Sequence, residues 1–237
     1  MDAFSAADKL RQPQPDGVLF VGSSSIRFWA HLSQDFQSMP VVINRGFGGS
    51  TMADCHHFVQ QLVVQYRPRQ VMVYAGDNDL AEGRTPAQVL ESFQGFVRAV
   101  RAELPGARIG YISIKPSPAR ASLLPQVRET NALLESFVAT LPNADYIDIF
   151  TPMLDAQNEP RADLYGPDRL HMNAAGYALW RGVIGPYVVP GEPKAPMLTA
   201  TAPTASPAPP AARSTAAVIP VSAKETVSVS LQGGAGR

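Results

Sequence analysis

The sequence predicts an α/β fold in which helices cover both faces of a parallel sheet of five strands. Between residues 18 and 189, short apolar runs alternate regularly with longer segments that have helical periodicity. The short runs are apolar at nearly every position, which is typical of strands buried on both faces. An alternating order of strands and helices favours parallel strands that lie between two helical layers.

The predicted strands are rich in Val, Ile, Tyr and Phe, residues that favour extended backbone. They are "VLFVG" (18–22), "VVINR" (41–45), "QVMVYAG" (70–76), "RIGYISI" (108–114) and "DYIDIF" (145–150).

The predicted helices cover roughly residues 25–36, 52–65, 86–104, 125–141 and 172–186. In the third of these, apolar residues recur at spacings of three and four and form one stripe. Thr85 provides a cap for this helix and Pro86 suits its first turn.

The 237 residues divide into three predicted parts. Residues 1–17 form an N-terminal lead segment, residues 18–190 form the folded domain, and residues 191–237 form a tail. The tail consists mainly of Ala, Pro, Ser, Thr and Val and has no aromatic residue. Such a composition buries too little apolar surface to offset the entropy of ordering the chain, so we expect the tail to be disordered.

The charge balance argues against nucleic acid and anionic membranes as partners. Twenty basic residues balance twenty acidic ones, and the sequence pI is about 6.9. Cys55 and the four histidines lack the spacing of a metal-ligand set, so we expect no metal site among them. No apolar run reaches the length of a membrane span, and the N-terminus lacks the pattern of a secretory signal, which predicts a cytoplasmic protein.

Small and polar residues follow almost every predicted strand. The ends carry Gly22-Ser23-Ser24-Ser25, Gly46 to Ser50, Gly76-Asp77-Asn78-Asp79 and Lys115 to Pro118, and the last loop leads to Asp168-Arg169-Leu170-His171. The carboxyl ends of parallel strands meet at one edge of the sheet, where ligands bind in folds of this class. Turn chemistry alone explains each segment, but it does not readily explain all of them together.

The side chains of these segments suit acyl transfer. Asp168 and His171 are three positions apart, so one helical turn would bring carboxylate and imidazole together. A serine of the first segment could serve as a nucleophile or as a helix cap. Gly49 in "GFGGS" and Asn78 in "GDND" could donate hydrogen bonds to an oxyanion, or simply form turns.

The ordered series "FVGSSS", "NRGFGGS", "YAGDND" and "DRLH" resembles the four sequence blocks of the SGNH hydrolase superfamily, the GDSL-type esterases and lipases. The resemblance extends over about residues 18–186. It implies a flavodoxin-like three-layer α/β/α sandwich and hydrolysis of carboxylic esters without a metal or organic cofactor. "GxND" and "DxxH" are the sharper matches.

The resemblance also implies roles for individual residues. Ser24 would be the nucleophile, Asp168 and His171 the acid and base, and Ser24, Gly49 and Asn78 the oxyanion donors. The first block departs from the family pattern, because Ser23 stands where members usually have aspartate. Ser50 likewise replaces an aspartate that often follows the glycine of the second block.

We therefore expect a serine esterase that acts on small acyl or acetyl esters. Alternatives are a lysophospholipase or acyl-thioesterase with the same fold, and a catalytically silent binding module. The expected partner is a small-molecule ester, and the sequence does not indicate an oligomeric state. Among the weaker candidates, we expect Phe28 and Trp29 to be core residues, Asp79 to be structural, and Arg27, Arg45 and Lys115 to be solvated or to cap helices.

Overall fold

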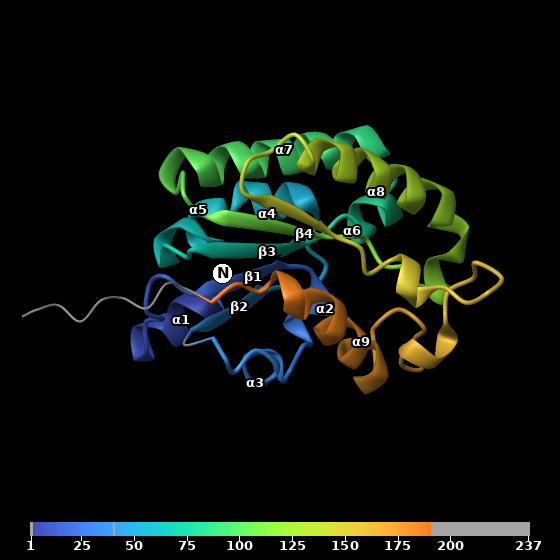
Figure 1. The fold of residues 1–237 in the computed structure, drawn as a ribbon, viewed down its shortest axis with the longest axis horizontal. Helices are drawn as coiled ribbons and strands as arrows, with labels where there is room; N and C mark the ends of the chain where they lie inside the picture. Colours follow the sequence, from blue (N-terminus) through green and yellow to red (C-terminus); the bar gives the residue numbers. More distant parts are fainter. Residues whose placement is uncertain (1, 40, 191–237) are drawn as a thin grey trace, which may run out of the picture. The chain divides into compact units, whose positions relative to one another are not determined.

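A computed structural model describes residues 2–39 and 41–190, and these residues form a parallel sheet of five strands between two helical layers (Figure 1). The order of the strands across the sheet is β2-β1-β3-β4-β5, and all neighbours are parallel. The predicted fold class is confirmed. The strands are β1 (Val18–Gly22), β2 (Val42–Gly46), β3 (Gln70–Tyr74), β4 (Arg108–Ile112) and β5 (Ala144–Ile147).

The described helices vary widely in length. They are α1 (Asp2–Leu10), α2 (Ser24–Arg27), α3 (Leu32–Asp35), α4 (Met52–His57), α5 (Val59–Leu62), α6 (Asp77–Ala81), α7 (Pro86–Glu103), α8 (Leu124–Val138) and α9 (Ala174–Ile184). Short 3-10 turns are η1 (Val64–Tyr66), η2 (Pro118–Leu123), η3 (Thr151–Met153), η4 (Ala162–Leu164) and η5 (Gly185–Tyr187).

Alternate residues of each strand face opposite helical layers. Leu19 and Val21 pack into the core beneath α4, α5, α7 and α8. Val18 and Phe20 pack into the core beneath α2, α3 and α9, where Trp180 is fully buried. Figure 1 shows these two sets of helices on opposite sides of the sheet. Each fully buried large side chain contributes about 1.5–3 kcal/mol relative to exposure, which is why both faces of the strands are apolar.

Several helices differ from the predicted ones. The segment 25–36 forms two short helices, because the chain leaves helical geometry at Phe28 and Trp29 then turns into the core beside Phe20 and Phe36. The segment 52–65 likewise divides into α4, α5 and η1. The lead segment contains α1, and "GDND" begins α6, neither of which was predicted. The predicted tail, residues 191–237, lies outside the described residues.

The predicted start of α7 agrees with the structure. Thr85 and Gln88 form a reciprocal capping box, and Pro86 occupies the first turn.

The end of β1 lies unusually close to β3. Gly22 has a φ of +145°, and a Cβ atom at this position would lie 1.8 Å from the carbonyl oxygen of Tyr74. Only glycine avoids that clash, so this residue brings the two strand ends together. The parallel arrangement places the residues after β1, β2 and β3 at one edge of the sheet.

Within residues 2–39 and 41–190, no helix is both long enough and apolar enough to cross a membrane. The same residues contain no cluster of three or more His, Cys, Asp or Glu side chains that could hold a metal ion.

Candidate active site

Three of the predicted site residues form one chain of hydrogen bonds. Ser24 is the first residue of α2, and its Oγ lies 2.9 Å from Nε2 of His171. The other ring nitrogen, Nδ1, lies 2.6 Å from Oδ2 of Asp168. The fold brings Ser24 and His171 together across 147 positions of sequence. This geometry allows His171 to accept a proton from Ser24 while Asp168 orients the ring.

A tight turn holds Asp168 and His171 together. Oδ1 of Asp168 accepts hydrogen bonds from the backbone N–H groups of Leu170 at 3.0 Å and His171 at 2.9 Å. The hydrogen bond from His171, followed by those from the two backbone N–H groups, lowers the pKa of Asp168 to about 2. The side chain of Asp168 is 52% exposed and that of His171 is 32% exposed. Asp168 is therefore an ionised carboxylate in open contact with solvent.

The three consecutive serines have different surroundings. Ser23 is fully buried, and its hydroxyl has no hydrogen-bond partner among the described residues. Ser25 is also buried, and its carbonyl oxygen accepts a hydrogen bond from the Tyr177 hydroxyl at 2.9 Å. Of the three hydroxyls, that of Ser24 contacts His171. The geometry thus distinguishes Ser24 from the two neighbouring serines, which the sequence alone does not do.

The predicted oxyanion donors lie on the two neighbouring connections. The N–H of Phe47 donates to the carbonyl of Gly22 at 2.9 Å, which attaches the "GFGGS" segment to the end of β1. Gly49 has a φ of +74°, a left-handed conformation that favours glycine. Nδ2 of Asn78, on α6, donates to the carbonyl of Ser50 at 3.0 Å. The segments that carry Gly49 and Asn78 are therefore in direct contact.

The N–H of Ser24 belongs to the first turn of α2, where backbone N–H groups have no acceptor within the helix. This N–H is therefore available to a developing negative charge beside the Ser24 hydroxyl.

A sequence model described as the GDSL-like lipase/acylhydrolase family matches residues 16–179. The chain belongs to this family. The match includes every predicted site residue, and membership makes the chain a hydrolase that acts on ester bonds. A search of curated proteins finds no match.

Solved structures of several other proteins share this fold. A GDSL-like lipase from Bacteroides thetaiotaomicron has a TM-score of 0.69 and 20% identity, with 79% of this chain and 96% of that chain covered. A lipase/acylhydrolase from Enterococcus faecalis has a TM-score of 0.60 and 20% identity, with coverages of 75% and 100%. A catalytic mutant of an acetylxylan esterase from Geobacillus stearothermophilus has a TM-score of 0.63 and 13% identity, with coverages of 76% and 96%.

A buried ionic cluster lies next to Asn78 in this GDSL-like hydrolase. Oδ2 of Asp77 lies 3.1 Å from Nζ of Lys115 and 3.0 Å from Nη1 of Arg120. Burial alone would raise the pKa of Asp77, but the positive charges of Lys115 and Arg120 outweigh it and lower that pKa. Lys115 also lies 3.3 Å from the hydroxyl of Tyr74.

Asp79 has the opposite electrostatic surroundings, although it lies only two residues further along α6. Its Oδ2 accepts the N–H of Met52 at 2.8 Å, at the start of α4. Burial raises the pKa of Asp79, since no cation forms an ion pair with it among the described residues. The contact with α4 agrees with the structural role expected from the sequence.

Phe28 departs from the sequence prediction. Trp29 is buried as expected, but Phe28 is 49% exposed, and its ring lies edge-on to His171 with 5.0 Å between the ring centroids. Helix α2 ends at Phe28, so the two adjacent aromatic residues do not continue one helical face. An aromatic pair in a presumed single helix gave no signal of this helix end.

Two of the predicted solvated cations are also buried. Lys115 is 2% exposed and pairs with Asp77. Arg45 is 7% exposed and pairs with Asp8 of α1 at 2.6 Å, so these two predictions were wrong. Arg27 is exposed, as expected. Arg120 was not singled out from the sequence, because nothing in "SPARAS" indicates the partners that it meets across the fold.

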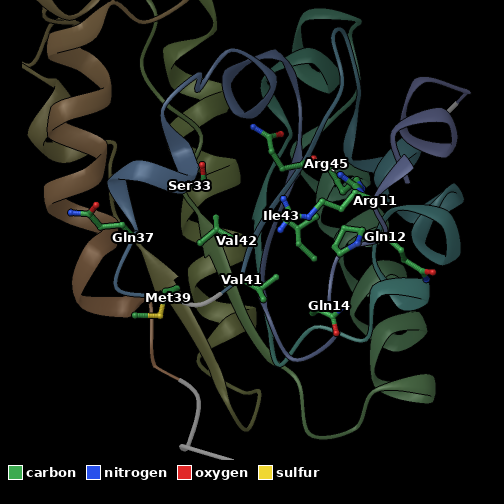
Figure 2. Close-up of a pocket in the computed structure, with 12 residues that line it drawn as sticks. Arg11, Gln12, Gln14, Ser33, Gln37, Met39, Val41, Val42, Ile43 and Arg45 are labelled. Carbon is green, nitrogen blue, oxygen red and sulfur yellow. Dashed lines mark hydrogen bonds between the residues drawn. The ribbon is translucent and has the colours of Figure 1, made fainter. Parts of the chain in front are cut away.

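The surface has a hollow beside Phe28 and a larger one elsewhere. The hollow beside Phe28 has a volume of about 330 Å³ and extends between α2, α3 and α9. The larger one, of about 700 Å³, lies along the outer edge of β2 and is lined by residues of the segments 11–14, 33–39 and 41–45 (Figure 2). Neither hollow is lined by Ser24, Gly49, Asn78, Asp168 or His171, so the size of a hollow alone does not locate the chemistry.

Proposed function

We propose that this hydrolase is a serine esterase that cleaves small acyl or acetyl esters through a covalent acyl-enzyme. Ser24 acts as the nucleophile, His171 as the general base and Asp168 as the residue that orients the ring. The N–H groups of Ser24 and Gly49 and the side-chain amide of Asn78 bind the oxyanion. The observation that carries this proposal is the continuous contact from Ser24 Oγ through both nitrogens of His171 to Asp168.

In the first half of the reaction, His171 removes the proton of the Ser24 hydroxyl while the oxygen attacks the ester carbonyl. The carbonyl oxygen becomes negative, and the three donors stabilise it. The positive charge that forms on His171 is stabilised by Asp168, whose pKa of about 2 keeps it ionised. The tetrahedral intermediate then breaks its bond to the alcohol, which takes the proton from His171.

The second half repeats these steps with water. His171 removes a proton from a water molecule, whose oxygen attacks the acyl group on Ser24. The second intermediate breaks its bond to Ser24 Oγ, and His171 returns the proton to that oxygen. The products are a carboxylic acid and the free enzyme.

The openness of the site supports small or surface-presented esters. The side chains of Asp168 and His171 are partly exposed, and Phe28 offers a half-exposed ring beside the histidine. Phe28 also lines the hollow of about 330 Å³, and its ring centroid lies 5.0 Å from that of His171. The hollow is large enough for a compact alcohol.

The direct test is Ser24→Ala. We expect the substitution to lower kcat on p-nitrophenyl acetate by about 10⁶-fold and to leave the melting temperature unchanged, because only the attacking oxygen is lost. A serine-directed fluorophosphonate should label the natural chain at Ser24 and not label the variant. A panel of esters that differ in acyl length and alcohol, with acetylated sugars and lysophospholipids, then defines the substrate.

Ser25→Ala is the matched control, since the adjacent hydroxyl has no contact with His171 and its loss should preserve turnover. Labelling at Ser23 or Ser25 would overturn the assignment of the nucleophile. A natural chain that neither turns over nor becomes labelled would instead be a silent binding module, and a preference for long acyl chains would favour the lysophospholipase alternative.

A further inference from the structure

Arg120 links the buried ionic cluster to the amide of Asn78. Its Nη2 donates to Oδ1 of Asn78 at 2.9 Å, and its Nη1 lies 3.0 Å from Oδ2 of Asp77. The Asp77 contact is an ion pair by distance, although it is not aligned as a hydrogen bond. One nitrogen of the guanidinium therefore donates a hydrogen bond to the proposed oxyanion donor, and the other forms an ion pair with a buried carboxylate.

Asp77 and Lys115 hold the Arg120 guanidinium in place. The side chains of Lys115 and Asp77 are only 1% and 7% exposed, and that of Arg120 is 20% exposed. A buried carboxylate with two cationic partners resists displacement, because leaving either charge unpaired in the interior is costly. Arg120 is thus held from the side that faces away from solvent.

The contacts of Asn78 specify which end of its amide faces which partner. Arg120 has only donors, so it can bind only the amide oxygen. The carbonyl of Ser50 has only acceptors, so it can bind only Nδ2, at 3.0 Å. Both contacts require the same orientation, and they occupy the oxygen and one of the two N–H bonds. The second N–H has no partner among the described residues and remains available to a substrate.

A reversed amide would place its oxygen where the second N–H now lies. The carbonyl oxygen of an ester becomes negative during attack, so a facing amide oxygen would repel it instead of stabilising it. Loss of Arg120 would remove one of the two contacts that exclude this reversed orientation, and the one that polarises the amide through its oxygen.

We propose that Arg120, anchored by Asp77 and Lys115, is a positioning residue that fixes the Asn78 amide with an N–H directed at the oxyanion. This inference rests on the proposed esterase function and adds a residue to it. Arg120 acts through Asn78 and does not itself touch the reacting atoms. The effect should therefore appear in kcat, since the oxyanion forms only in the transition state.

The segment that carries Arg120 also touches the loop of the acid and base, which supplies a competing explanation. The N–H of Ala119 donates to the carbonyl of Arg169 at 3.0 Å. A substitution at Arg120 could thus act by disturbing His171 and Asp168, or by removing a cation that binds acidic substrates. The experiment has to separate these explanations.

The decisive experiment is a double-mutant cycle between Arg120→Met and Asn78→Ala, measured by kcat and KM on p-nitrophenyl acetate. Alone, Arg120→Met should lower kcat by roughly 10- to 100-fold, less than removal of an oxyanion donor itself. In the Asn78→Ala background the same change should alter kcat by less than about 2-fold, because coupled residues are not additive. KM should stay within about 2-fold of that of the natural chain.

Two further variants complete the design. Arg120→Lys should restore part of kcat, since lysine can still donate to Oδ1 of Asn78. Arg128→Met is the matched control, because Arg128 is exposed on α8 and makes its contacts to Asn158 and Phe150 away from Asn78. This control should keep the kcat of the natural chain. If Arg120→Met does not fold, as shown by its melting curve, Arg120→Lys carries the cycle.

Equal losses of kcat in both backgrounds would overturn the proposal and favour disturbance of the acid–base loop. A rise in KM confined to esters that carry a carboxylate would overturn it in favour of a substrate-binding cation. A natural chain without esterase activity would refute the proposed function and this inference with it. An active natural chain with an unaffected Arg120→Met variant would refute this inference alone.

Discussion

The two halves of the proposed site, which we call the acid–base half and the oxyanion half, differ in burial and in the origin of their parts. Asp168 and His171 come from one four-residue turn and remain substantially exposed. The oxyanion half combines Gly49 and Asn78 with the buried cation Lys115 and the partly buried cation Arg120, and these residues come from three different connections. Solvent screens the first half, whereas the interior strengthens every charge interaction in the second.

This contrast suggests a division of tasks between the halves. A histidine that gains and loses protons benefits from access to water, and one local carboxylate is enough to orient it. Oxyanion donors must already be in place when charge develops, so rigidity is worth more to them than access. We therefore expect substitutions in the exposed half to affect activity with little effect on stability, and those in the buried half to affect both.

The largest effect in this comparison is expected from Asp168→Asn. The substitution should lower kcat by up to about 10⁴-fold, because an amide no longer stabilises the protonated ring or fixes its tautomer. The melting temperature should remain within about 2 °C, since an exposed side chain contributes little to folding. Steady-state kinetics and calorimetry on one preparation measure both. A large loss of stability would show that the exposed half also supports the fold.

The next effect is expected from Asn78→Ala, which should lower kcat by roughly 10²- to 10³-fold through loss of one oxyanion donor. KM should change little. Asn78→Asp has the same shape but cannot donate when ionised, so its kcat should fall at least as far. If the aspartate variant kept the kcat of the natural chain, Asn78 would not be an oxyanion donor.

A smaller effect, on stability, is expected from Asp77→Asn. Lys115 would lose its buried counter-charge, and we expect a loss of about 3 kcal/mol in the free energy of unfolding at pH 7. The pKa of Asp77 is lowered from 3.8, so its contribution is complete above that pH and disappears as the pH falls through the lowered value. Urea unfolding at a series of pH values should show that the difference in free energy of unfolding between the variant and the natural chain becomes smaller below pH 3.8.

Asp79→Asn is the matched control for this measurement. The pKa of Asp79 is raised from 3.8, so the natural residue loses stability as the pH rises through that raised value. Asparagine can still accept a hydrogen bond from the N–H of Met52 and carries no charge. The free energy of unfolding of the variant should therefore rise relative to that of the natural chain between pH 4 and pH 7. Similar pH trends for both variants would contradict the assignment of opposite environments to these two carboxylates.

The strands and the acid–base half could be predicted well from the sequence. Strands that are buried on both faces are recognisable as apolar runs in the sequence. The start of α7 is recognisable from the capping residue Thr85 and the first-turn residue Pro86. The positions of Ser24, Asp168 and His171 follow from polar residues at strand ends combined with the family resemblance, and the structure brings these three into contact. Their catalytic roles stay predictions until the variants are measured.

The oxyanion half could be predicted only in part. Gly49 and Asn78 lie in recognisable segments, but Arg120 contacts Asn78 across 42 positions and Lys115 contacts Asp77 across 38. Such pairs leave no local pattern, and isolated basic residues are usually solvated. Phe28 was misjudged for a related reason, because α2 ends at this residue and Trp29 then packs against Phe20 and Phe36, which are contacts that the local sequence does not indicate.

The glycine that ends β1 determines where this enzyme tolerates engineering. Any side chain at Gly22 would have to displace the backbone of Tyr74, and Ser24, two residues beyond the end of β1, would move with it. In a directed-evolution library, the codon for residue 22 should therefore be kept constant. Phe28, half-exposed beside His171, is the nearby codon to randomise when a change of substrate scope is sought.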